Sequence, residues 1–188
     1  MTNKLFWLFS HLFYFPMKRI LVGIFLILSV TSVFAQKTED MYVMRHSSDG
    51  QLYFIRPIMF SSADSKAELS CDITHLNTKD TASVKMTIYE TTLVRVDSVA
   101  LVSNGARFLC DEVSSIYKEK DNKLWAHRCD CPFPYQEVKL AMTADQAPTI
   151  IVYTNKSTLS YTMVANKWAK LRLRFWDIFT LIDESKRN

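Results

Sequence analysis

Apolar and polar residues alternate without a break from Ala67 to His75. One face of this run carries the odd-numbered side chains, which are Ala67, Leu69, Cys71, Ile73 and His75. Successive side chains of a β-strand point to opposite faces of the sheet, so the run predicts a strand with one buried and one solvated face. Val84, Met86 and Ile88 repeat the pattern against Lys85 and Thr87.

Two Asx-Gly pairs predict where such strands turn back. Asp49-Gly50 and Asn104-Gly105 suit the central positions of type I′ turns, which need positive φ. The first pair would join residues 41–47 to 51–60, where Pro57 indicates an edge or a bulge because it cannot donate a ladder hydrogen bond. The second would join 94–102 to 107–117 and place Phe108 opposite Leu101 and Cys110 opposite Val99.

Further elements follow from the same patterns. Residues 123–131 read as a strand returning from 107–117 across the loop Glu119–Asn122. Residues 149–154 and 159–164 form another hairpin, and Pro134–Thr143 a short helix. A last helix is expected over 166–184 with Asn166 as N-cap, because one helical face gathers Trp168, Leu171, Phe175, Ile178 and Ile182.

Two interpretations of this last helix are open. It docks its apolar stripe on the sheet, or it lies on a membrane surface through its cations Lys167, Lys170, Arg172 and Arg174. Docking is favoured, since amphipathic helices of globular proteins have this pattern. The predicted fold class is therefore mainly β (α+β): an antiparallel β-sandwich or bent sheet with a C-terminal amphipathic helix packed on it.

The beginning of the chain is typical of a secretory signal peptide. Residues 1–16 precede a better start at Met17 and are interpreted as a non-translated extension. Residues 17–35 combine Lys18 and Arg19, the apolar run 20–30 and a small-residue site, so cleavage is expected between Ala35 and Gln36. A retained anchor is the alternative, although the apolar run is shorter than the roughly 20 residues of a membrane span.

Removal of residues 1–35 changes the charge of the protein. Lys+Arg falls from 23 to 20 while Asp+Glu stays at 19, so the net charge drops from +4 to +1. A nearly neutral chain does not favour a nucleic-acid partner. We expect residues 36–188 to form a single domain that does not span a membrane, in the periplasm or at the cell surface.

Four cysteines in an exported chain favour disulfides. The expected ladder places Cys110 opposite Cys131, which leaves Cys71 to reach Cys129; Cys110–Cys129 with Cys71–Cys131 is the neighbouring possibility. A metal site at His127, Cys129 and Cys131 is the alternative. Their C-x-C spacing differs from the usual C-x₂₋₄-C of zinc sites, so the metal hypothesis is the weaker one.

Reaction motifs are missing from the sequence beyond residue 35. Gly50 and Gly105 are its only glycines, which excludes a P-loop, a dinucleotide-binding turn and a G-x-S-x-G elbow. No cofactor is indicated. We expect an exported, non-enzymatic module that binds a protein or glycan partner. The alternative is an envelope hydrolase or metal-dependent enzyme whose site assembles from distant residues such as His75, His127 and Asp130.

Overall fold

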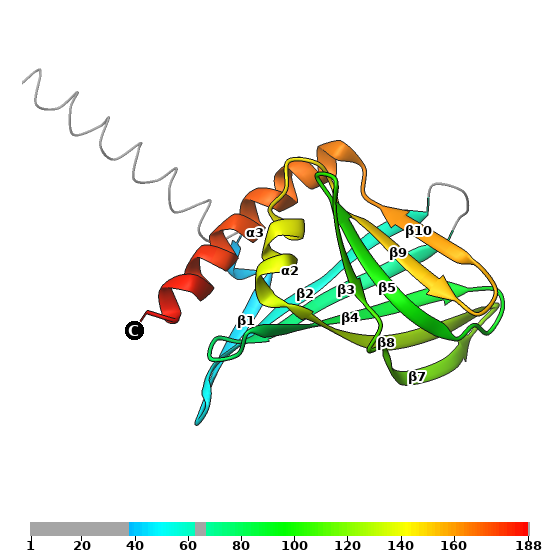
Figure 1. Cartoon of the computed structure of the whole chain (residues 1–188), viewed down its shortest axis with the longest axis horizontal. Coiled ribbons are helices and arrows are strands. Elements are labelled where there is room, and N and C mark those ends of the chain that lie inside the picture. Colours follow the sequence, from blue (N-terminus) through cyan, green and yellow to red (C-terminus); the bar gives the residue numbers. More distant parts are fainter. Residues whose placement is uncertain (1–37, 63–66, 188) are drawn as a thin grey trace, which may run out of the picture. The chain divides into compact units, whose positions relative to one another are not determined.

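From Met41 onward the chain folds mainly as one antiparallel sheet (Figure 1). The computed structural model describes residues 38–62 and 67–187, and the chain divides into one unit up to Asp40 and a second from Met41. The described elements of the second unit are β1 (Tyr42–Ser47), β2 (Gly50–Ser62), β3 (Glu68–Leu76), β4 (Thr81–Glu90), β5 (Val96–Ser103), β6 (Ala106–Cys110), β7 (Ser114–Asp121), β8 (Leu124–Pro134), α2 (Tyr135–Met142), β9 (Thr149–Thr154), β10 (Thr158–Thr162) and α3 (Ala165–Ser185).

The order of the strands requires a strong bend. It runs β6-β5-β9-β10-β2-β3-β4-β8-β7, with β1 added beside β2. A flat sheet of this order would separate β6 from β7 by about 38 Å at a spacing of about 4.8 Å per strand. Residues 111–113 connect these two strands, however, and the step from Cys110 to Ser114 spans at most about 14 Å. The sheet therefore curves until β6 packs against β8, but no ladder joins its ends.

The concave face of the bend holds the core. Leu69, Cys71, Ile73 and His75 are all at most 2% exposed, so the alternation that predicted β3 is confirmed. The expected partners on β4 are buried completely; they are Val84, Met86 and Ile88. The predicted class is thus confirmed as mainly antiparallel β with a C-terminal helix packed on it, in the form of one bent sheet.

The second predicted hairpin has the expected register. Ser103 pairs with Ala106, Leu101 with Phe108 and Val99 with Cys110. Both turn residues have positive φ, 48° at Asn104 and 79° at Gly105, as a type I′ turn requires.

The first hairpin is shifted by one residue from the prediction. Ser47 pairs with Gly50, so the turn residues are Ser48 and Asp49. Gly50 lies in β2 with φ 137°, where a Cβ atom would come within 2.5 Å of Asn77 Oδ1. The glycine is required by this close approach, which places the side-chain Oδ1 of Asn77 to accept a hydrogen bond of 2.9 Å from the Gln51 backbone N–H.

β2 changes its neighbour along its length. Its first half pairs with β1, and its end pairs with β10 through Ser61 and Ser62. Between these parts the register with β3 shifts from Ile55 to Ile58, around Pro57. The predicted bulge is confirmed, since proline has no N–H for the ladder.

The strand expected over 107–117 is wrong. β6 ends at Cys110 and β7 begins at Ser114, and the two strands lie at opposite ends of the strand order. The loop expected at Glu119–Asn122 is also corrected. Asp121 pairs with Leu124, so the turn consists of Asn122 and Lys123, with Asn122 at φ 55°.

Both predicted helices are present, within one residue of the expected ends. The buried stripe of α3 consists of Trp168, Phe175, Ile178, Phe179 and Ile182. Asn166 is not the N-cap, because the backbone N–H groups of Lys167 and Trp168 both donate to the carbonyl of Val164, which makes Val164 the capping residue.

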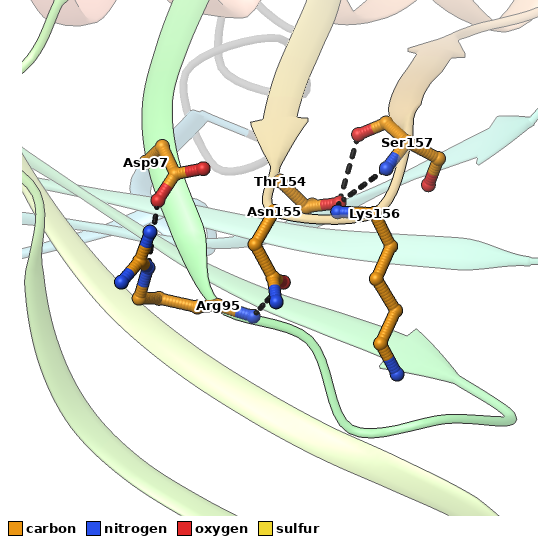
Figure 2. A network of polar contacts seen from close by, with 6 residues as sticks. All are labelled: Arg95, Asp97, Thr154, Asn155, Lys156 and Ser157. Atoms are coloured by element: carbon orange, nitrogen blue, oxygen red, sulfur yellow. Dashed lines mark hydrogen bonds and ion pairs between the residues drawn. The ribbon is translucent and has the colours of Figure 1, made fainter.

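A polar network fixes the loop before β5 against the β9–β10 turn (Figure 2). The Asn155 side chain accepts from the Arg95 backbone N–H at 2.9 Å, and the Asn155 N–H donates to the Arg95 carbonyl at 3.0 Å. Thr154 Oγ1 donates to the Ser157 carbonyl at 2.8 Å and so closes the turn. These bonds hold the loop before β5 against the β9–β10 turn.

Candidate functional site

The three residues proposed for an enzyme site do not converge. His75 pairs with Ala82, and His127 with Ile88, six positions further along β4. Both side chains face the core. Six residues at the usual rise of a strand separate their positions by about 20 Å along β4. Asp130 alternates to the opposite face, where it accepts a hydrogen bond of 2.5 Å from Ser83 Oγ. One hydrolytic centre cannot include all three side chains in this arrangement.

His75 is buried as a neutral imidazole at the end of β3. Its Nδ1 lies 3.0 Å from the Thr81 carbonyl, so Nδ1 carries the proton and Nε2 is left as a buried acceptor without a partner. Its ring stacks on Tyr135 with the centroids 4.1 Å apart. Burial lowers the pKa of His75 to about 4. This arrangement suits a packed core histidine.

Tyr135 is the centre of a polar network that the sequence did not predict. Its hydroxyl donates to Asp183 Oδ1 at 2.8 Å, and Lys139 forms an ion pair with the other oxygen of Asp183. Lys186 Nζ lies 3.7 Å from the Tyr135 ring centroid. The members come from α2 and from the end of α3, more than forty positions apart in sequence. No local pattern encodes such a contact.

The chemistry of this network is that of a structural ion pair. Burial and the bond to Asp183 raise the pKa of Tyr135, so its hydroxyl stays protonated. Burial alone would raise the pKa of Asp183, but hydrogen bonds from Lys139 and Tyr135 outweigh it and lower that pKa. Tyr135 thus stays protonated while Asp183 stays ionised. The network joins α2 to the end of α3.

His127 has a different setting at the other end of β4. Its Nε2 lies 3.3 Å from Ser115 Oγ on β7, and the residue is 3% exposed. Burial and the charge of Lys118 lower the pKa of His127. The side chain therefore fills the core between β7 and β8 as a neutral ring.

Three of the four cysteines meet where β6 packs on β8. Cys131 is hydrogen-bonded to the thiols of both Cys129 and Cys110. The bond between Cys129 and Cys131 lowers the pKa of Cys129 and, with burial, raises that of Cys131, so Cys131 holds its proton. Burial raises the pKa of Cys110 as well.

All four cysteines are free in this structure, with no two sulfurs at bonding distance. Cys110 is near Cys131 as expected, but through packing of β6 on β8 and not through a ladder. The expected pairing of Cys71 with Cys129 is not compatible with the register. Met86 of β4 pairs with both residues, so their Cα atoms are roughly 9–10 Å apart, beyond the 4.4–6.8 Å of a disulfide.

The metal hypothesis gains no support from the geometry. Among residues 38–62 and 67–187, no group of three or more His, Cys, Asp or Glu side chains is arranged to hold a metal ion. His127, Cys129 and Cys131 follow one another at every second position of β8, so their Cα atoms stand in a row roughly 7 Å apart. Ligands of one zinc ion must instead converge to about 2 Å from it.

Two small pockets lie away from these side chains. Met59, Glu68, Tyr89 and Leu124 line one of about 230 Å³ on the outer face. Ser103, Asn104, Ala106, Phe108 and Leu140 line another of about 110 Å³. Both are below the roughly 300 Å³ typical of small-molecule sites. Neither is lined by His75, His127 or Asp130.

The strand edges differ in how they are protected. β7 carries a bulge between Ser115 and Tyr117 and the charges Lys118, Glu119 and Lys120, which discourage pairing with another strand. β1 pairs with β2 through six consecutive residues without a bulge. Its Val43 and Met44 are each 40% exposed. Of these two edge strands, β1 is the better suited to accept another strand.

Comparison with protein-family models, curated proteins and solved structures found no match to this chain. The helices of the described segments are also too short or too polar to cross a bilayer.

Proposed function

We propose that the chain from Gln36 is a non-enzymatic binding module of the periplasm or cell surface, and that it recognises a protein partner at the open edge of β1. The exposed edge of β1, with Val43 and Met44, is the observation that carries this proposal. Addition of a strand to a sheet edge supplies main-chain hydrogen bonds, while alternate side chains give specificity. A glycan has no main-chain ladder to offer this edge, so a polypeptide is favoured.

The hydrogen-bonding direction of β1 follows from its first ladder bond. Arg56 N–H donates to the Met41 carbonyl at 2.8 Å, so Met41 points its backbone groups toward β2. In an antiparallel pair this direction alternates at every residue. Val43 and Arg45 therefore also point toward β2, whereas Met44 and His46 present N–H and C=O groups to the open edge.

A proline substitution at Met44 tests the proposal. It removes an outward N–H and keeps the ladder to β2, as proline is tolerated on the open side of an edge strand. Lys118→Pro is the matched control on β7. The pair Asp121–Leu124 closes the turn with hydrogen bonds, so Asp121 and Glu119 point their backbone groups toward β8. Lys118, at the alternate position, therefore also points its backbone N–H toward the open edge.

The measurement is affinity for the partner captured from the envelope fraction of the source cell. We expect Met44→Pro to weaken binding at least tenfold and Lys118→Pro to leave it within twofold. Equal affinities for the wild type and both variants would refute strand addition at β1. Capture that survives digestion of the fraction with protease would instead identify a glycan partner.

A further inference from the structure

α3 carries a second apolar stripe opposite the one that it buries. Ala169, Leu173, Trp176 and Thr180 follow one another at helical spacing and are all exposed. Leu173 is 58% exposed and Trp176 is 49% exposed. A helix of a globular protein usually presents charged or polar residues on this side, so two large apolar side chains here require an explanation.

The first three turns of α3 are also strongly basic. Between Ala165 and Trp176 the helix carries Lys167, Lys170, Arg172 and Arg174 and no acidic residue. Arg172 forms an ion pair with Asp145. In the described part of the chain Lys167, Lys170 and Arg174 form no ion pair. Up to Trp176 the second apolar stripe thus runs between cations, and the exposed Asp177 lies beside its end.

The positive charge at the start of α3 is unfavourable with respect to the helix dipole. The N-terminus of a helix carries a partial positive charge, so a cation in the first turn, here Lys167, is unfavourable. α3 has no acidic residue in its first turn and no side-chain cap that would offset this cost. A negatively charged surface bound to these turns would offset it.

We propose that the first three turns of α3 bind the surface of a membrane that contains anionic phospholipid. In this arrangement Leu173 and Trp176 insert at the level of the headgroups and Lys170 and Arg174 contact lipid phosphates. Exposed Trp and Leu flanked by Lys and Arg are the side chains of an interfacial helix. Each cation near an anionic leaflet adds to the attraction.

The choice of a lipid surface over an acidic protein follows from the combination of side chains. An acidic protein would be recognised by the cations, but it would not require a tryptophan and a leucine beside them. The opposite stripe of α3 is packed in the core through Trp168 and Phe175, so the helix is held in one orientation. Docking on the sheet and contact with a membrane therefore use opposite faces of one helix.

Vesicle sedimentation of the exported, processed protein tests this proposal. We expect binding to vesicles of phosphatidylcholine with one quarter phosphatidylglycerol, at least tenfold weaker binding to pure phosphatidylcholine, and loss of binding as salt is raised. Leu173→Ser with Trp176→Ser should weaken binding at least tenfold, and Lys170→Glu with Arg174→Glu should do the same. Met59→Ser with Leu124→Ser is the matched control, because it removes exposed apolar side chains at another place.

Tryptophan fluorescence gives a second readout. Trp168 is buried, with its indole N–H donating to the Ala144 carbonyl at 3.0 Å, whereas Trp125 on β8 is half-buried, so a blue shift on vesicle binding is assigned to Trp176 only where Trp176→Phe removes it. Trp176→Phe should abolish the shift and retain most of the binding. Equal binding to neutral and anionic vesicles, or no effect of the four α3 substitutions, would overturn the proposal. Met44→Pro should not alter vesicle binding, which keeps this test separate from that of the β1 edge.

Discussion

Tyr135 shows how much of this fold depends on single side chains that bring distant segments together. Its ring stacks on His75 of β3, its hydroxyl binds Asp183 of α3, and it begins α2. Because the tyrosine and the imidazole share one buried site, the charge state of His75 bears directly on the stability of the fold.

Acidification should destabilise the protein through His75. The folded pKa of about 4 lies below the unfolded value of about 6.5, so below pH 6.5 the unfolded state binds more protons than the folded state. Stability is then lost progressively from pH 6.5 to pH 4, by about 3 kcal/mol from this group. Urea unfolding at several pH values measures the loss.

The variant His75→Phe keeps an aromatic ring on Tyr135 and removes the titrating group. We expect it to be less stable than the wild type at pH 7.5, because the Thr81 carbonyl loses its donor, but to lose less stability on acidification. His46→Asn, at an exposed position of β1, is the control. An unchanged pH slope in His75→Phe would contradict the assignment.

At the scale of elements, the two hairpin glycines differ in what they require. Gly105 has φ 79° with open space around its Cα, so alanine there adds only backbone strain, about 1–2 kcal/mol. At Gly50 a Cβ would meet Asn77 Oδ1 at 2.5 Å and Thr78 Cγ2 at 2.9 Å. Asn77 also donates to the Ser185 carbonyl at 3.1 Å, which connects this turn to the end of α3.

Gly50→Ala should therefore cost more stability than Gly105→Ala. We expect the difference in unfolding free energy to exceed about 1 kcal/mol, because the alanine must displace a hydrogen-bonded side chain as well as strain the backbone. Chemical unfolding of both variants under identical conditions makes the comparison. A larger effect at Gly105 would show that Asn77 adapts without cost.

The elements themselves were largely predictable. Alternation identified β3 and β4 because the period of a strand is a local property, and the 3.6-residue period identified α3. The boundary errors have local causes as well. Gly50 is needed because Asn77 approaches it closely, and it is not a turn residue. Asn166 lies within the helix, because Val164 is its N-cap.

At the scale of the whole molecule, the short link 111–113 determines the curvature of the sheet. It brings Cys110 of β6 against Cys131 of β8, so a disulfide here would join two strands that no ladder connects. The loop closed by this bond has about 20 residues, for which the chain-entropy model gives a stabilisation of about 3 kcal/mol.

Oxidation of the folded protein should therefore link Cys110 to Cys131 or to the adjacent Cys129 and leave Cys71 as a thiol. Two thiols lose two protons and two electrons, which a small-molecule disulfide such as oxidised glutathione accepts. Non-reducing peptide mapping identifies the bond, and Cys110→Ser should abolish it. A bridge that contains Cys71 would contradict the strand order, because β4 lies between β3 and β8.

Local pattern by itself determined which segments are strands, which face of each is buried and where the last helix lies, since these depend on backbone period and turn chemistry. The tertiary structure alone decided which strands are neighbours. That order separates His75 from His127, places β4 between Cys71 and Cys129, and assembles the Tyr135 network. It also decided that α3 buries one apolar stripe and leaves another exposed. Such outcomes depend on packing between segments far apart in sequence. A local sequence pattern does not specify which of these segments pair or how they align.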